Sequence, residues 1–170
     1  MAKASRVRAP LPLTSKHECG QFDCGREPLH DYLKRFAWLN QRAGAARTYV
    51  ATRGNRVVGY YTLASGSVEH EQVSPRVRKG LARHPIPVIV LARLAVDRRY
   101  QGQGLGKGLL KDALLRTLQA ADIAGLRAVV VHAKDERAKR FYAKFGFEPS
   151  PVDEFHLMLL LEDLREAVTG

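Results

Sequence analysis

Hydrophobic and polar positions along the chain follow two periods, one typical of helices and the other of strands. Between positions 27 and 43, apolar residues lie four, seven and eight positions after the first of them, which places all of them on one face of a helix. These residues are Leu29, Leu33, Phe36 and Ala37. Pro28 suits the first turn of a helix and Gly44 suits the position after its end, so one helix is predicted here.

Stretches rich in β-branched and aromatic residues predict strands. They lie at positions 48–52, 57–64, 88–96, 128–132 and 155–161. Because the turn-forming pair Gly54-Asn55 separates the first two stretches, they are predicted to form a hairpin. The long run VIVLARLAV at 88–96 is predicted to be a central strand.

Helical spacing returns in the second half of the chain, at positions 104–121 and 135–145, with a short helix ending near 168. The polar segment 66–83 predicts a loop with room for a short helix. Residues 1–12 are basic and predict a flexible N-terminal arm, followed by a single domain at 13–170. The element order predicts an α/β (α+β) fold, with a mixed central sheet flanked by helices.

The charge balance narrows the choice of partners. The 28 Lys and Arg residues outnumber the 17 Asp and Glu residues, and the formal net charge is +11. This favours nucleic acid, an anionic membrane or a phosphorylated ligand. The longest apolar run is interrupted by Pro87 and stopped by Arg93, too short to span a membrane, and no apolar signal-peptide stretch is apparent. A cytoplasmic protein with no membrane partner is expected.

The two cysteines, Cys19 and Cys24, do not suggest a disulfide framework. A zinc site needs about four ligands, and only His17 lies nearby in the sequence. We therefore expect two free thiols in a reducing compartment and no metal.

A glycine-rich loop carries the strongest chemical signal. Glycines stand at 102, 104, 106 and 108, between the predicted central strand and the next helix. Glycine lets a backbone approach a ligand closely, and a helix start offers unpaired N–H groups and the positive end of the dipole. This combination binds phosphate. A turn that only packs the helix on the sheet is the alternative, but it needs fewer glycines.

Two common phosphate loops do not fit this segment. In a Walker A loop a hydroxyl residue follows the Gly-Lys pair, whereas here Gly106-Lys107 is followed by Gly108. A dinucleotide fingerprint, G-x-G-x-x-G, started at Gly102 or Gly104 reaches Lys107 or Leu109 instead of its third glycine.

The pattern Q-x-x-G-x-G, at Gln101, Gly104 and Gly106, resembles the pyrophosphate loop of GNAT-type N-acetyltransferases. The pattern A-x-x-F-Y-x-x-x-G-F, from Ala138 to Phe147, is also similar to that family. The resemblance implies a GNAT fold whose sheet is splayed at the cofactor site, and acetyl-CoA as the acetyl donor. It assigns the following residues to coenzyme binding: Leu94, Ala95 and Val96 beside the pantetheine arm, and Gln101, Gly102, Gln103, Gly104, Leu105, Gly106 and Lys107 around the diphosphate.

The same resemblance places Tyr142 beside the coenzyme A sulfur as the general acid. A phenol with a pKa near 10 is protonated at neutral pH and can donate. The alternative role is packing, which Phe141 and Phe145 can supply. The backbone N–H of Leu94 or Ala95 would meet the developing oxyanion. No carboxylate stands out as a base, and His132 is as readily structural, which favours an α-amine acceptor with a pKa near 7.7–8.

Several segments resemble the GNAT toxins of bacterial toxin–antitoxin pairs. They are Phe22–Gly25, Leu29–Leu33, Asn40–Val50, Leu94–Asp97 and Phe147–Pro151. Those toxins acetylate the α-amine of the amino acid on charged tRNA, which blocks translation. The resemblance therefore implies charged tRNA as substrate, a DNA-binding antitoxin as partner, and a homodimer.

Basic side chains are candidates for the tRNA phosphates, because such binding is led by charge and shape. They are Arg42, Arg47, Arg76, Arg78, Lys79, Arg83 and Arg93. Each alone is as readily a solvated surface charge, and only the cluster between 76 and 83 exceeds that expectation. Two alternatives stay open: acetylation of a protein N-terminus or a small amine, and a non-catalytic RNA- or antitoxin-binding module of the same fold.

Overall fold

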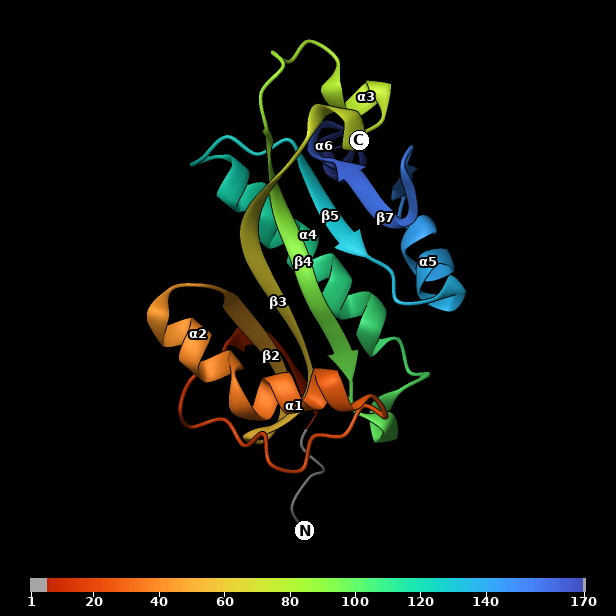
Figure 1. Ribbon diagram of the computed structural model, residues 1–170. Coiled ribbons are helices and arrows are strands. Elements are labelled where there is room, and N and C mark those ends of the chain that lie inside the picture. The colour runs from red at the N-terminus through yellow and green to blue at the C-terminus, as the bar shows by residue number, and fades with distance from the viewer. Residues whose placement is uncertain (1–5, 170) are drawn as a thin grey trace. The chain divides into compact units, whose positions relative to one another are not determined.

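The computed structural model describes residues 6–169 (Figure 1). Residues 1–5 of the predicted arm, and Gly170, lie outside the described residues. The elements in chain order are β1 (Val7–Pro12), α1 (Glu27–Arg35), α2 (Ala37–Ala43), β2 (Arg47–Arg53), β3 (Arg56–Val68), η1 (His70–Gln72), α3 (Pro75–Arg78), β4 (Ile86–Val96), η2 (Arg98–Tyr100), α4 (Leu105–Ala121), β5 (Ala128–His132), α5 (Glu136–Ala143), β6 (Glu148–Ser150), β7 (Asp153–Leu160) and α6 (Leu161–Thr169).

The strands form one sheet in the order β1-β2-β3-β4-β5-β7-β6. Strands β4 and β5 pair in parallel, with Val88–Val90 opposite Ala128–Val130. The pairs β1–β2, β2–β3, β5–β7 and β6–β7 are antiparallel. The sheet is therefore mixed and accompanied by helices, which confirms the predicted α+β class.

Contacts along the chain divide it into two compact units. The first unit comprises residues 1–64 and 92–113, and the second comprises 65–91 and 114–170. Strands β3 and β4 and helix α4 contribute residues to both units. The division of the chain into an arm and a single domain at 13–170 stays a prediction.

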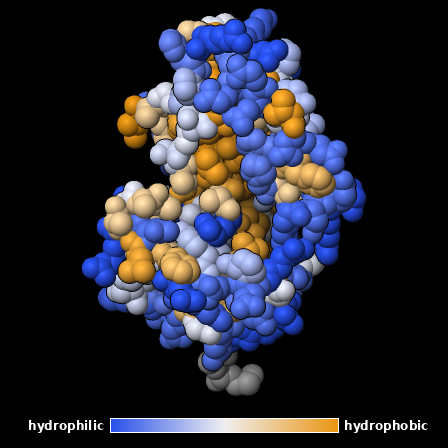
Figure 2. Space-filling model, in the orientation of Figure 1, coloured by the Kyte–Doolittle hydropathy of each residue, from blue (hydrophilic) through white to orange (hydrophobic). Residues whose placement is uncertain are grey.

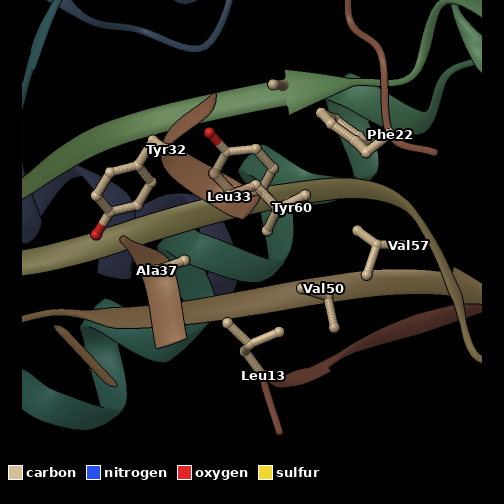
Figure 3. Close-up of a cluster of buried hydrophobic side chains, with 9 residues drawn as sticks. Leu13, Phe22, Tyr32, Leu33, Ala37, Val50, Val57 and Tyr60 are labelled. Carbon is tan, nitrogen blue, oxygen red and sulfur yellow. The ribbon is translucent and has the colours of Figure 1, made fainter. Parts of the chain in front are cut away.

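The first unit has a core between its two N-terminal helices and its strands (Figure 3). Two neighbouring tyrosines of β3 contact helices on opposite faces of the strands. The Tyr60 hydroxyl donates to the Leu29 carbonyl on α1 at 2.5 Å, whereas the Tyr61 hydroxyl donates to Asp112 on α4 at 2.5 Å. Alternate side chains of a strand point to opposite faces, so these two tyrosines reach helices on opposite sides. Gly59 leaves room for α4, since a Cβ there would lie 3.0 Å from Leu109 Cδ1.

The second unit has its own core, built on β4, β5 and β7. Strand β5 lies between them, parallel to β4 and antiparallel to β7. The core residues are Val68, Val73, Val77, Ile86, Val88, Ala128, Val130, Met158 and Leu160. All residues of β5 but the last are buried, as is typical of a strand that is covered on both faces.

The predicted hairpin, central strand and helices at 104–121 and 135–145 are confirmed within a few residues. Three differences have physical causes. Val7–Pro12 was expected within the flexible arm, but it forms an edge strand that pairs with β2. The helix predicted over 27–43 is two helices, since Phe36 has φ −118° and ends α1. Phe36 is also 44% exposed, and Tyr32 takes the buried position instead.

Candidate active site: a glycine loop and a buried tyrosine

The glycine loop lies in the first unit, between η2 and the start of α4. Gly102 and Gly104 have φ angles of +78° and +85°, which only glycine adopts readily. A Cβ added at either position would meet no atom within 4 Å, so the space around both is open. The loop therefore has the shape and the room for a ligand to lie against its backbone.

Helix α4 begins directly behind this loop. The Gly108 amide donates to the Gly104 carbonyl at 3.1 Å, as the first turn of the helix requires. The amides of residues 105–107 precede it and have no intrahelical acceptor. Gln101 to Gly104 and Lys107 are exposed, whereas Leu105 and Gly106 are half-buried. Exposed amides at the positive end of a helix dipole can hold a phosphate.

Asp97 anchors the start of the loop from inside the protein. Its side chain has no exposed surface, and Oδ1 accepts hydrogen bonds from the Arg99 amide at 3.0 Å and from Arg99 Nε at 3.1 Å. Oδ2 accepts from Arg99 Nη2 at 3.1 Å and from the Asp23 amide at 3.2 Å. Charge-assisted bonds of this kind are strong, so the segment after β4 is held to the region around Asp23.

The Gln101 side chain holds the loop in place. Its Nε2 donates to the Val96 carbonyl at 2.8 Å and to the Cys24 carbonyl at 3.2 Å. The side chain thus ties the loop to the end of β4, and only the backbone of Gln101 is left to face a ligand. Similarly, Gln103 Nε2 lies 3.5 Å from the Arg99 carbonyl.

Asp23 joins this network from the segment before α1. It accepts a hydrogen bond from the Gly25 amide at 2.9 Å and pairs with Arg98 at 3.2 Å. The backbone bond from Gly25, followed by the positive charge of Arg98, lowers the pKa of Asp23. A charged Asp23 therefore keeps Arg98 beside the loop at neutral pH.

The end of β4 carries the three residues predicted to flank the pantetheine arm. Ala95 is 5% exposed and belongs to the core of the first unit, whereas Leu94 and Val96 are half-buried. The role of these residues stays a prediction.

Tyr142 lies in the second unit, on α5. Asp135 caps this helix by accepting from the Ala138 amide at 2.8 Å, and Gly146, with φ +93°, follows its end. The Tyr142 ring is 7% exposed and contacts the rings of Phe141 and Phe147 at centroid distances of 5.2 and 5.5 Å. Burial raises the pKa of Tyr142 to about 12, which keeps the phenol protonated at neutral pH.

Three of the predicted tRNA contacts, Arg42, Arg47 and Arg93, lie in the first unit. Arg42 and Arg47 are exposed, and Arg47 Nη1 lies 3.5 Å from the Gln41 carbonyl. Arg93 is half-buried, and its guanidinium lies 3.6 Å from the centroid of the Tyr32 ring. This cation–π contact fixes Arg93 while leaving its N–H groups to bind an anion.

The other four, from Arg76 to Arg83, lie in the second unit and differ in what they already contact. Arg76 pairs with Glu148 at 3.3 Å and with Asp163 at 2.8 Å. Arg78 lies near backbone carbonyls, at 3.5 Å from that of His70 and 3.4 Å from that of Val73.

Lys79 is exposed, and Arg83 is 81% exposed although it lies 3.4 Å from Glu71. The members of the sequence cluster therefore differ in their contacts. Arg76 and Arg83 are exposed but pair with carboxylates, Arg78 is half-buried near backbone carbonyls, and Lys79 is exposed.

Arg127 holds this segment in place, a role that the sequence did not suggest. Its Nε donates to the Val77 carbonyl at 2.8 Å, and its Nη2 lies 3.3 and 3.4 Å from the Arg76 and Lys79 carbonyls. One guanidinium thus satisfies the C-terminal carbonyls of α3.

Cys19 and Cys24 are both free thiols, as predicted. Burial raises the pKa of Cys19 to about 11, which makes it unreactive at neutral pH. Within residues 6–169, no cluster of His, Cys, Asp and Glu side chains could hold a metal ion. None of the helices in that range is long and apolar enough to cross a membrane.

Comparison with known proteins identifies the family to which the glycine loop and helix α5 belong. Residues 44–149 match the acetyltransferase (GNAT) domain family, a span that includes β4, the glycine loop and α5. The chain belongs to the GNAT acetyltransferase family. As a GNAT enzyme it transfers acetyl groups from acetyl-CoA, which confirms the predicted fold, enzyme class and acetyl donor.

Relatives of this GNAT acetyltransferase are toxins. A tRNA-acetylating toxin of Mycobacterium tuberculosis is 48% identical over 164 residues, covering 96% of this chain and 98% of the relative. The structure of AtaT complexed with acetyl-methionyl-tRNAfMet has a TM-score of 0.88 and 29% identity, covering 94% of this chain and 98% of AtaT. AtaT bound to the C-terminus of the antitoxin AtaR and to acetyl-CoA has a TM-score of 0.83 and 29% identity, covering 98% and 100% of the two chains. The resemblance to GNAT toxins is thereby confirmed.

The glycine loop of this GNAT acetyltransferase fits a diphosphate on its own geometry. Residues 101–104 and Lys107 are exposed, the two left-handed glycines leave open space, and α4 starts behind the loop. The sequence predicted these features because they are local. It did not reveal the contacts of Asp97 with the Asp23 amide and of Gln101 with the Cys24 carbonyl, because these partners are distant in the sequence.

Proposed function

We propose that this GNAT acetyltransferase transfers acetyl from acetyl-CoA to the α-amine of an amino acid esterified to tRNA, and so blocks translation. The observation that carries this proposal is the 48% identity, across 96% of the chain, to a tRNA-acetylating toxin. The similarity to AtaT captured with an acetylated aminoacyl-tRNA supports the same acceptor. The net charge of +11 is a third, independent support, because tRNA binding is led by phosphate contacts.

Acetyl-CoA, when bound, supplies an activated acetyl thioester. The amides at 102–107 hold its diphosphate at the start of α4. The backbone of Leu94, Ala95 and Val96 lies along the pantetheine arm in the manner of an added strand. The amide of Leu94 or Ala95 donates to the carbonyl oxygen on which negative charge grows.

Tyr142 is the proton donor to the departing thiolate in this proposal. Burial raises the pKa of Tyr142 to about 12, so the proton that this role requires is present at neutral pH. Structures of KacT and AtaT variants in which a tyrosine is replaced by phenylalanine are among those similar to this chain. Replacement of a tyrosine in two such relatives is consistent with a functional hydroxyl.

The acceptor amine needs little help to become nucleophilic. An α-amine has a pKa near 7.7–8, so a useful fraction is neutral at physiological pH, whereas a lysine amine near 10.4 would need a strong base. The exposed side chains of Arg42, Arg47, Lys79 and Arg83 are the candidates for tRNA phosphates with the freest access to solvent. Arg93 stays a candidate beside Tyr32, whereas Arg76 and Arg78 also contact groups within the protein.

We further infer that the protein forms a homodimer and is neutralised by a DNA-binding antitoxin. Complexes of AtaT with AtaR on DNA, and of KacTA with DNA, support the antitoxin. Apolar side chains gathered over α2 give a surface for protein contacts (Figure 2). They are Phe36, Trp38 and Leu39, which are 44%, 37% and 58% exposed. A cytoplasmic location follows from the proposed substrate, charged tRNA.

The decisive experiment follows labelled acetyl from acetyl-CoA into total charged tRNA, uncharged tRNA and bulk protein. We expect label only on charged tRNA, released with the amino acid when the ester is hydrolysed, and none with Tyr142→Phe. Label on protein N-termini or small amines would replace this proposal with another acceptor. Binding of RNA or antitoxin without any label transfer would make the chain a non-catalytic module.

A further inference from the structure

Two imidazole rings lie against each other in the second unit, outside the residues assigned so far. His132 is the last residue of β5, and His156 lies directly opposite on β7 in the antiparallel register. Their ring centroids are 4.4 Å apart and the ring planes differ by 7°. Directly opposite residues of antiparallel strands share a face, so the pairing of the strands itself produces the stack.

The outer ring of this stack is held in orientation. His132 Nε2 lies 3.5 Å from Asp153 Oδ2, at the start of β7. Asp153 is itself fixed, because its Oδ1 accepts from the Phe155 amide at 2.9 Å. The same backbone bond, followed by the contact with His132, lowers the pKa of Asp153, so the carboxylate is charged at neutral pH.

The two rings differ in exposure. His156 is 8% exposed, and its burial lowers its pKa, which makes it a neutral, flat surface beneath His132 at neutral pH. The His132 side chain is 70% exposed. With one face on His156 and one nitrogen near Asp153, the exposed parts are its outer face and its other edge. This is a stack of two flat rings with one open end.

We propose that His132 is a stacking platform for an unpaired nucleobase, the adenine at the 3′ end of the tRNA substrate. The inference rests on the proposed function and deepens it, by naming the residue that receives the end of the tRNA. Proteins recognise single-stranded RNA ends by stacking bases on aromatic side chains, including histidine. Such stacking accepts any flat base and needs a ring whose orientation is already fixed.

Two other roles for this pair are less consistent with the geometry. The nitrogens of parallel stacked rings point sideways in their own planes, so they do not converge on a metal, and no metal-binding cluster occurs within residues 6–169. A proton acceptor would need only the edge of one ring, and the stack on His156 would then have no function. The stacked arrangement is what a platform requires.

A fluorescent RNA tests the platform directly. The probe is an acceptor-stem minihelix whose 3′-terminal adenine is replaced by 2-aminopurine, whose emission falls when the base stacks. We expect full-length protein to quench the probe. His132→Phe keeps a flat ring and should quench equally, whereas His132→Ala should lose the quench and bind the minihelix about 5–150-fold more weakly, the range that one base stack provides. His84→Ala, which removes another exposed imidazole, is the matched control.

Acetylation of charged tRNA separates stacking from proton transfer. A platform predicts a raised KM and a nearly unchanged kcat for His132→Ala, and wild-type kinetics for His132→Phe. If His132→Phe lost activity with an altered pH–rate profile, His132 would be a proton acceptor and the platform would be overturned.

An unchanged quench in His132→Ala would overturn the platform and leave the proposed function intact. Wild-type protein that neither bound the minihelix nor acetylated charged tRNA would overturn both. Circular dichroism of the variants should be unchanged, since the His132 side chain is mostly exposed.

Discussion

The two compact units present their candidate chemistry in different ways. In the first unit the candidate contacts to coenzyme come from the backbone, through the amides at 102–107 around two left-handed glycines, although Arg42, Arg47 and Arg93 also lie in this unit. In the second unit the candidate chemistry comes from side chains, namely the Tyr142 phenol, the His132 ring and the cations of Lys79 and Arg83. A backbone donor depends on local conformation, whereas a side chain depends on what it already contacts. That is why the conformation of the glycine loop could be predicted from the sequence, whereas the contacts of Arg76 and Arg78 within the protein could not.

The largest effect should come from one side-chain atom in the second unit. Tyr142→Phe removes the proposed proton donor and should lower kcat roughly 10²–10⁴-fold, while acetyl-CoA binds with unchanged affinity. Steady-state rates and calorimetric titration measure the two quantities. Tyr100→Phe removes another tyrosine hydroxyl, one that contacts Arg53, and should keep wild-type rates. Wild-type activity in Tyr142→Phe would disprove the proposed acid.

In the glycine loop, acetyl-CoA affinity should depend on backbone conformation and not on a particular side chain. Gly104→Val forces a β-branched residue to φ +85°, at a cost of about 1–3 kcal/mol, so acetyl-CoA affinity should fall roughly 5–150-fold. Gly108→Ala is the control, because Gly108 lies in a regular helical turn and a Cβ there meets no atom within 4 Å. Equal affinities for the two variants, measured by calorimetry, would contradict phosphate binding by this backbone.

Within the second unit, the exposed cations can be compared with a cation that is already ion-paired. The double change Lys79→Gln with Arg83→Gln should make the slope of log affinity for tRNA against log salt shallower, by roughly one for each phosphate that these cations neutralise. Arg76→Gln should leave that slope unchanged and lower the midpoint of urea unfolding only slightly, because the ion pairs that it removes are exposed. Filter binding at several salt concentrations and urea titration distinguish them. A reversal of these two effects would mean that Arg76 binds tRNA.

The smallest effect concerns pH and the buried ring of the histidine pair. Burial holds the pKa of His156 below its ordinary value of 6.5. Below pH 6.5 the unfolded chain therefore binds a proton at this residue that the folded chain does not, and stability falls as the pH drops from 7 to 5. His156→Phe should make the free energy of unfolding less dependent on pH over that interval. His17, whose pKa is also lowered by burial, is present in both proteins and contributes equally. An unchanged dependence would show that His156 is accessible to protons in the folded state.

The sequence predicted elements whose signals are local. The β2–β3 hairpin, β4, β5 and the two long helices followed from periodicity and turn residues. The sequence did not predict strand β1. Pro10 and Pro12 are unusual in strands, and the β2 residues that pair with β1 lie about forty positions away in the sequence. The sequence also did not predict the break between α1 and α2, because α1 ends at Phe36 without a glycine or proline.

The same distinction applies to the candidate site. The loop could be predicted because glycine spacing alone determines where the backbone is exposed. The contact of Asp97 with the Asp23 amide joins residues 74 positions apart, and the stack of Arg93 on Tyr32 also joins distant segments. His132 was recognised only as an isolated histidine, since its partners His156 and Asp153 lie on another strand. Composition could count the cations but could not show which of them were already paired.

The buried carboxylate of Asp97 has a thermodynamic consequence. All the contacts described for it come from the protein itself, from Arg99 and the Asp23 amide, so the segment after β4 has its shape before acetyl-CoA arrives. Little conformational entropy then remains to be lost on association. Binding free energy that would otherwise be spent on ordering this segment is therefore available to hold the donor.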